Sequence, residues 1–93
     1  MMQPIHPGRI LKRELKARNL PANQLALALC VPSGRITSIL NSKRSITPET
    51  ALRLARYFGN SAQFWLNLQT RYDLLTTEAE IGDRIKAEIA IAT

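Results

Sequence analysis

The stretch from Leu20 to Arg44 constrains the fold of this chain more than any other segment does. Apolar residues recur in it at steps of three and four, which is the spacing of a buried face on each of two short helices. The two groups are Leu25, Ala26 and Leu29, and then Ile36, Ile39 and Leu40. Only Cys30-Val31-Pro32 separates them. Proline cannot continue the first helix, but its fixed φ suits the start of the second, so the pattern predicts a helix-turn-helix.

The other face of the second expected helix consists of small or hydrogen-bonding residues. Its members are Ser33, Gly34, Thr37, Ser38 and Asn41, with Arg35 at the flank. Such a face can enter a DNA major groove, where its polar groups reach base edges. Lys43 and Arg44 follow directly, where contacts to sugar and phosphate would fix register without reading sequence. The alternative for these two helices is an ordinary solvated hairpin.

Length favours one compact domain, and the helical spacing of its apolar residues predicts the all-α class. The chain has 93 residues, enough to bury a single core. One cysteine and one histidine are too few for an internal disulfide or a structural zinc site, so neither Cys30 nor His6 is expected to be a functional group. We find no membrane-span pattern, signal peptide, catalytic constellation or phosphate loop. The sequence therefore predicts a cytoplasmic protein that is not an enzyme and that has no metal or cofactor.

The charge is unevenly distributed along the chain. Residues 1–56 contain ten lysines or arginines and two acids, a net charge of +8, whereas residues 57–93 contain three and five, a net charge of −2. Most of the basic residues in the first part are arginine, the better bidentate partner for phosphate and guanine. A polyanion would be attracted to the half that contains the helix-turn-helix.

Three further helices complete the expected domain. The first begins at Pro7, ends near Arg18 and directs Ile10, Leu11 and Leu15 inward. A helix capped by Thr47 is expected to run to about Tyr57, and Gly59 is its expected left-handed stop. Its predicted inner face is Ala51, Leu52, Leu54 and Ala55. Ser61 caps a fifth helix that contains Phe64, Trp65, Leu68 and Tyr72, which we assign to the core in preference to a partner surface.

A final helix is expected beyond this five-helix unit. Thr77 and Glu80 have the spacing of a capping box, and Ile81, Ile85 and Ile89 would form an apolar stripe behind it. That stripe would either fold back on the core or pair with a second copy of the chain. We therefore expect a helix-turn-helix domain over residues 1–75 and a C-terminal helix over residues 76–93 that is a candidate for dimerisation.

Several longer motifs resemble the HigA family of antitoxins. They are His6-Pro7-Gly8, Val31 to Ile36, Asn41 to Thr47, Thr50 to Gly59 (TALRLARYFG) and Phe64 to Gln69 (FWLNLQ). The resemblance covers roughly residues 5–75 and is far more specific than the helix-turn-helix alone. It implies a lambda-repressor-like fold of five helices. It also implies a homodimeric repressor that binds an inverted-repeat operator of double-stranded DNA, autoregulates its operon and neutralises a RelE-like ribonuclease toxin of the HigB type.

The resemblance also assigns roles to individual positions. It implies that the residues that read DNA bases are Ser33, Gly34, Arg35, Thr37 and Ser38. It implies that three residues lie near the DNA backbone, namely Asn41, Lys43 and Arg44. It also implies that two residues at a helix start approach phosphate, namely Asn23 and Gln24. Cys30 occupies the turn position that is commonly glycine, so the turn is expected to be strained or differently shaped.

Two other functions fit the same residues. A free-standing phage-type regulator would keep the DNA binding and have no toxin partner, and a neighbouring toxin gene would argue against it. A protein-binding module would have no DNA role, and a steep fall of duplex binding with salt would exclude it.

Overall fold

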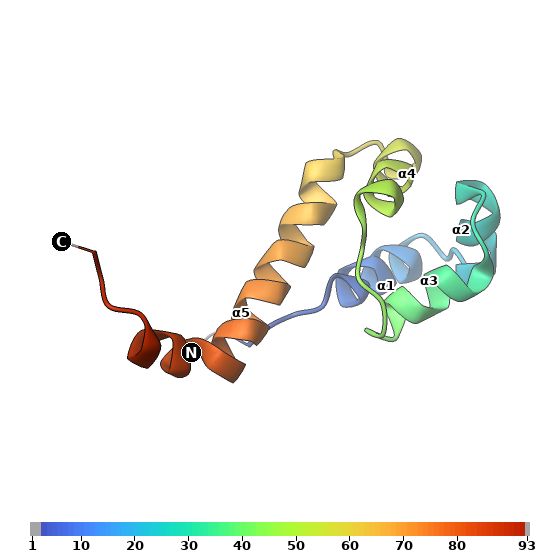
Figure 1. Cartoon of the computed structure of the whole chain (residues 1–93). Helices are drawn as coiled ribbons and strands as arrows, with labels where there is room; N and C mark the ends of the chain where they lie inside the picture. The colour runs from blue at the N-terminus through green and yellow to red at the C-terminus, as the bar shows by residue number, and fades with distance from the viewer. Residues whose placement is uncertain (1–2, 93) are drawn as a thin grey trace.

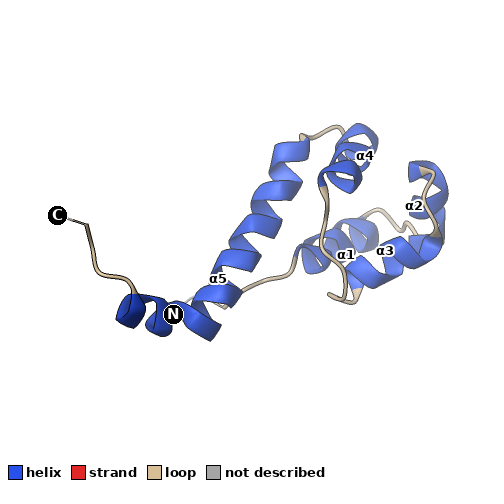
Figure 2. Ribbon diagram, viewed as in Figure 1, coloured by secondary structure: helices blue, strands red, loops and turns tan. Residues whose placement is uncertain are grey.

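The computed structural model describes residues 3–92, and this part of the chain contains five helices and no strand (Figure 2). The helices are α1 (Pro7–Ala17), α2 (Ala22–Leu29), α3 (Ser33–Leu40), α4 (Pro48–Phe58) and α5 (Ala62–Glu88). Helices α1 to α4 gather at one end, and α5 leads away from them toward the C-terminus (Figure 1). The resulting body is elongated, with extents of 52 × 22 × 21 Å. The predicted all-α class and five-helix unit are confirmed.

One apolar core joins all five helices. Trp65 of α5 is its largest side chain and has no exposed surface. The other members are Leu11, Leu15, Leu25, Ala26, Leu29, Ile36, Ile39, Ile46, Ala51 and Leu54. The Nε1–H of Trp65 donates to Oδ1 of Asn60 at 2.9 Å, so burying the indole leaves no polar group unpaired. The expectation that the aromatic helix contributes to the core is thus confirmed at Trp65. It is wrong at Phe64, which is 42% exposed, while Leu68 and Tyr72 are half-buried.

Side-chain caps begin three of the helices. Oγ1 of Thr47 accepts from the amide of Thr50 at 3.4 Å, and Oγ of Ser61 accepts from that of Phe64 at 3.0 Å, both as expected. The third cap was not foreseen. Nδ1 of the buried His6 accepts from the amide of Gly8 at 2.9 Å, which starts α1.

Residues with positive φ end the first four helices. Gly59 is the expected stop of α4, with φ of 75°, whereas Asn19, Cys30 and Ser42 adopt the same conformation without being glycine. The bend at Cys30 is closed by a 3.0 Å hydrogen bond from the amide of Val31 to the carbonyl of Ala26. This is the Schellman arrangement, in which a left-handed residue lets the chain return to the last turn. The turn therefore keeps the standard geometry although cysteine occupies the position at which glycine is favoured. The cysteine side chain is strained there, because its φ is positive.

The start of α1 packs tightly on the end of α3. A Cβ added to Gly8 would overlap the backbone carbonyl of Ile39, so only glycine permits this approach. The ring of His6 lies edge-on to that of Tyr72 of α5, with centroids 4.9 Å apart. In the motif His6-Pro7-Gly8, the first residue caps the helix, the second starts it and the third lets it approach α3.

Two sequence expectations about the later helices were wrong. Leu52 is 64% exposed instead of facing inward, because the inner face of α4 is narrower than predicted and its buried apolar residues are Ala51 and Leu54. The separate helix expected from Thr77 is the continuation of α5. Thr77 lies inside an unbroken helix, where the backbone amides already have carbonyl partners, so a capping box has no unpaired amide to satisfy. The hydroxyl of Thr76 donates to the carbonyl of Tyr72 at 2.7 Å, a contact that often bends helices, and α5 changes direction in its second half (Figure 1).

The apolar stripe beyond this point does not fold back on the core. Ile81 is half-buried, Ile85 is 42% exposed, and Ile89 is 66% exposed at the C-terminal cap of α5. The structure therefore excludes the first of the two alternatives, in which the stripe folds back on its own core. Pairing with a second copy stays a prediction, as does the division into residues 1–75 and 76–93.

Candidate nucleic-acid interface

The inner face of α3 fixes which of its residues reach the surface. Ile36 and Ile39 have no exposed surface and anchor α3 against α1 and α2. The residues on the opposite side are exposed, namely Ser33, Gly34, Thr37 and Asn41, whereas Ser38 is half-buried. The structure therefore brings together most of the predicted reading face, and Ser38 has the least access to a groove.

Gly34 and Thr37 give this face a defined chemistry. A Cβ added to Gly34 would meet nothing within 4 Å, so this position is open to a closely approaching ligand. The hydroxyl of Thr37 donates to the carbonyl of Ser33 at 2.7 Å. Because that proton is already used, Thr37 can offer a base edge only an acceptor oxygen and a methyl group, which suit a base amino group or a thymine methyl.

The first turns of α2 and α3 are unlike those of α4 and α5. The N-cap residues of α2 and α3 are Pro21 and Pro32, which provide no side-chain cap, and neither first turn contains an acid. In contrast, Thr47 and Ser61 cap α4 and α5. An uncapped helix start has free amides and a positive dipole end, which together attract phosphate. Asn23 and Gln24 are exposed in the first turn of α2, and their contact with phosphate stays a prediction.

The loop after α3 is held at both ends while its basic side chains stay in solvent. Lys43 and Arg44 are exposed. The amide of Lys43 donates to the carbonyl of Ser38 at 2.8 Å, and the amide of Ile46 donates to Oε1 of the buried Gln69 at 2.8 Å. Sequence reasoning missed Gln69, although a glutamine in line with Trp65 on one helix face was a signal of a buried polar contact.

Arg35 does not extend freely from α3. Its Nη1 lies 3.1 Å from Oε1 of Glu49 on α4, and its side chain is 24% exposed. The other oxygen of Glu49 is 3.2 Å from Nη2 of Arg53. The hydrogen bond from Arg53, followed by the charge of Arg35, holds the pKa of Glu49 below its ordinary value. Sequence analysis did not single out Glu49, although the arginine four residues later was a signal of a helical ion pair.

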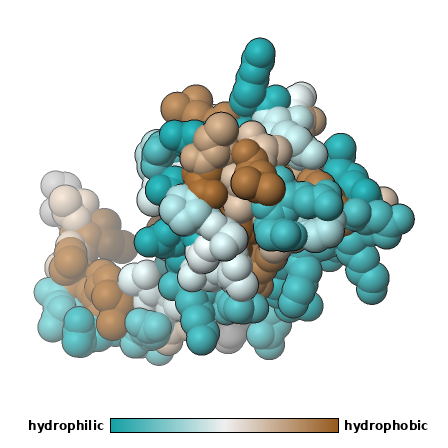
Figure 3. Space-filling view, turned by 90° about the vertical axis from the view of Figure 1, so that its right-hand side faces the viewer, coloured by the Kyte–Doolittle hydropathy of each residue, from teal (hydrophilic) through white to brown (hydrophobic). Residues whose placement is uncertain are grey.

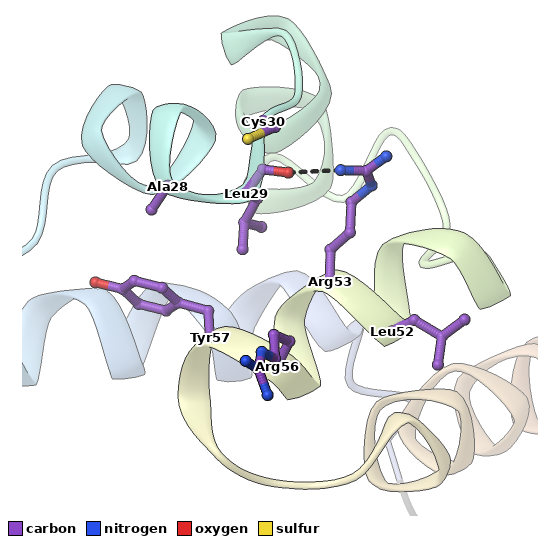
Figure 4. Close-up of a pocket in the computed structure, with 7 residues that line it drawn as sticks. All are labelled: Ala28, Leu29, Cys30, Leu52, Arg53, Arg56 and Tyr57. Carbon is purple, nitrogen blue, oxygen red and sulfur yellow. Dashed lines mark hydrogen bonds between the residues drawn. The ribbon is translucent and has the colours of Figure 1, made fainter.

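The face that contains α2 and α3 is mainly hydrophilic, with an apolar patch among the polar residues (Figure 3). Beside it, between the end of α2 and α4, lies an open hollow of about 570 Å³. Its lining residues are Ala28, Leu29, Cys30, Leu52, Arg53, Arg56 and Tyr57 (Figure 4). Most of this lining is apolar, so the hollow is chemically distinct from the polar face of α3.

Two short helices joined by a tight turn, the second with an exposed polar face, define a helix-turn-helix protein. Residues 11–65 match the family model described as helix-turn-helix, which is more than half of the chain. The chain is 54% identical over 80 residues to virulence-associated protein I of Dichelobacter nodosus, covering 85% of this chain and 74% of that protein. It is therefore a helix-turn-helix protein and not an enzyme.

Solved structures narrow the family. A HigA-family antidote protein from Coxiella burnetii superposes with a TM-score of 0.95 at 49% identity, covering 98% of this chain and 100% of the other. Pseudomonas aeruginosa antitoxin HigA, solved with the higBA promoter, gives a TM-score of 0.95 at 42% identity and the same coverage. The chain belongs to the HigA family of antitoxins. Among residues 3–92, no helix is long and apolar enough to cross a lipid bilayer.

Proposed function

We propose that this protein is a cytoplasmic, homodimeric repressor that binds an inverted-repeat operator through α3 and acts as the antitoxin of a RelE-like ribonuclease toxin of the HigB type. It would autoregulate the operon that encodes both proteins. The observation that carries the DNA-binding part is the pair of uncapped, acid-free helix starts at α2 and α3, beside the exposed polar face of α3. The solved relative with its promoter supports the same assignment.

The residues divide into two groups by their expected role. Ser33, Gly34, Thr37 and Ser38 would read base edges together with Arg35. Asn23, Gln24, Asn41, Lys43 and Arg44 would contact the sugar–phosphate backbone and set the register. Since α3 has only eight residues and its inner face is buried, few side chains can read each half-site.

The dimer would form through the second half of α5, which extends away from α3. Leu74, Ile85 and Ile89 are exposed there, and covering them with a second copy would remove apolar surface from water while both α3 helices stay free. A twofold dimer of this kind binds half-sites centred about one helical turn apart, roughly 34 Å, or a multiple of that distance.

A salt titration of alanine variants tests the DNA-binding part. The probes are a duplex enriched from a random-sequence library by the wild-type protein and a scrambled duplex of the same composition. Thr37→Ala should weaken binding to the enriched duplex and leave the scrambled duplex almost unchanged. Lys43→Ala should weaken both and lower the salt slope by about one per lost phosphate contact. Equal losses on both duplexes for Thr37→Ala and Arg35→Ala would exclude readout by α3.

Co-expression with the product of the adjacent open reading frame tests the antitoxin part. The expected result is a copurifying complex and relief of growth arrest caused by that product. DNA binding without such a partner would instead identify a free-standing regulator. Failure to enrich any duplex, combined with copurification, would identify a protein-binding module.

A further inference from the structure

The carboxylate of Glu49 connects two arginines and, through them, three helices. Arg35 donates to Oε1 from α3 at 3.1 Å, and Arg53 donates to Oε2 from the next turn of α4 at 3.2 Å. Nη1 of Arg53 donates in turn to the carbonyl of Leu29, the last residue of α2, at 2.8 Å (Figure 4). This cluster of Arg35, Glu49 and Arg53, called here the Glu49 bridge, therefore ties α2 and α3 to α4.

The bridge fixes where the guanidinium of Arg35 can go. Arg35 is the third residue of α3, and its side chain has several rotatable bonds that would let a free guanidinium reach many phosphates or base edges. Two arginines share one carboxylate, so the cluster keeps a net charge of +1 and the charge of Arg35 is offset only in part. An arginine that is held in one orientation and partly neutralised is already placed for one binding geometry, and it contacts phosphates at other positions less readily.

Contacts with the rest of the protein hold the side chain of Arg53 in place, so that it can orient the carboxylate of Glu49. Its side chain is 38% exposed, and its Nε is buried without a hydrogen-bond partner among the described residues. The side chain is therefore drawn against the protein at some desolvation cost, with its two terminal nitrogens held by Glu49 and Leu29. The carbonyl of Leu29 precedes the left-handed Cys30, so the bridge is anchored at the turn of the helix-turn-helix.

We propose that Glu49 is a positioning residue for DNA specificity, which holds the Arg35 guanidinium in one orientation and withholds it from nonspecific phosphate contacts. The inference rests on the proposed DNA binding by α3. Without Glu49, Arg35 would become a mobile cation on the DNA-binding face. Binding to any sequence would strengthen, and the preference for one sequence would fall.

Glu49→Gln tests this with Glu14→Gln as the matched control. Both substitutions replace a carboxylate by an amide and raise the net charge by one. Glu49→Gln removes the ion pairs with Arg35 and Arg53, whereas Glu14→Gln removes one pair, which joins Glu14 of α1 to Arg18 at its C-terminal cap at 3.3 Å. Only Glu49→Gln frees Arg35. Binding to the enriched and scrambled duplexes is measured over a range of salt concentrations for both variants and the wild type.

Glu49→Gln is expected to strengthen binding to the scrambled duplex, to steepen its salt slope by about one, and to lower the ratio of the two affinities about tenfold. Glu14→Gln should leave the slope and the ratio unchanged. In an Arg35→Ala background, Glu49→Gln should have no further effect on either quantity. Melting curves followed by circular dichroism verify folding, and Glu49→Ala provides a second variant that should give the same slope and ratio.

Three results would overturn the proposal. One is an unchanged affinity ratio in Glu49→Gln, and another is the same change in Glu14→Gln. The third is a steeper slope that persists in the Arg35→Ala background, because the freed cation would then be Arg53. Each of these leaves the proposed DNA binding intact, whereas a wild-type protein that enriches no duplex would overturn both.

Discussion

The two halves of α5 have the same secondary structure but different surroundings. In the first half, Trp65 has no exposed surface and Gln69 is 5% exposed. In the second half, none of residues 70–88 is buried, and Leu74 and Ile85 are 66% and 42% exposed. One half is held by the core of its own chain, and the other half extends from it.

The comparison shows that a helix need not be packed along its whole length once it has started. Forming the first turn is the costly step, whereas each added residue extends a helix that already exists. The Ser61 cap and the buried Trp65 provide the start, and residues 70–88 continue it. The second half can therefore present apolar side chains without an intramolecular partner, which is what a subunit interface requires.

The largest expected effect comes from removing the anchor of the first half. Trp65→Ala should lower the free energy of unfolding by about 3–5 kcal/mol, because it removes the largest side chain of the core and leaves a cavity there. Leu74→Ala, on the second half of the same helix, should change it by less than about 0.5 kcal/mol. Urea unfolding measures both. Similar losses for the two variants would mean that the halves are not held differently.

The next effect concerns the buried polar contact of the first half. Gln69→Met keeps the length of the side chain but leaves the amide of Ile46 buried without its acceptor, at an expected cost of about 1–3 kcal/mol. The control is Gln63→Met, since Gln63 is exposed on the same helix and its side chain bonds to that of Asn67, which is also exposed. That variant should stay within about 0.5 kcal/mol of the wild type in urea unfolding. Equal stability of the two variants would show that the Gln69 contact contributes nothing.

A smaller effect is expected where the two halves meet, at the contact of His6 with Tyr72. Burial lowers the pKa of His6 from 6.5, although a hydrogen bond to the backbone of Arg44 and the charge of Asp73 act in the opposite direction. The unfolded chain then takes up the proton first. This contribution to stability is complete above pH 6.5 and is lost as the pH falls through the lowered value.

Melting temperatures recorded between about pH 8 and pH 5 measure this effect, because the chain has one histidine and the range extends to both sides of its ordinary pKa of 6.5. His6→Asn keeps an acceptor for the cap but does not titrate. It should melt at a lower temperature than the wild type at neutral pH and show a weaker fall toward pH 5. A parallel fall in both proteins would assign the pH dependence to carboxylates instead.

The smallest effect on the folded chain is expected at the far end of α5. Ile85→Ser should change the stability of the monomer by less than about 0.5 kcal/mol, since the side chain packs against little of its own chain. It should nevertheless weaken the dimer, measured as a higher dissociation constant in sedimentation. A dimer of unchanged affinity would place the interface elsewhere.

The sequence predicted the parts of this fold that depend on local patterns. The caps at Thr47 and Ser61, the stop at Gly59 and the buried residues of α2 and α3 follow from spacing and residue type. The continuity of α5 did not follow, because Thr77 and Glu80 form a valid capping pattern that matters only if the helix has already ended. Local signals at such a position cannot show whether a helix arrives from upstream.

The sequence predicted which residues make up the candidate site, but it did not predict the contact that joins Arg35 to another helix. The exposed residues of α3 and the basic loop lie where their order implied. The bond between Arg35 and Glu49 joins residues 14 positions apart on helices whose relative placement depends on Ile36, Ile39 and Ala51 in the core. Such a contact is a product of tertiary packing, so no periodicity within either helix could reveal it.

The three left-handed bends that lack glycine have a consequence for turnover in the cell. Cys30 and Ser42 each cost on the order of 1 kcal/mol relative to glycine, and Asn19 costs somewhat less because asparagine tolerates this conformation better. Together they raise the unfolded fraction by roughly one to two orders of magnitude, because about 1.4 kcal/mol corresponds to a factor of ten. Proteases degrade chains from that unfolded fraction. The side chains at these bends therefore shorten the lifetime of every unbound copy, while any partner that binds the folded chain extends it.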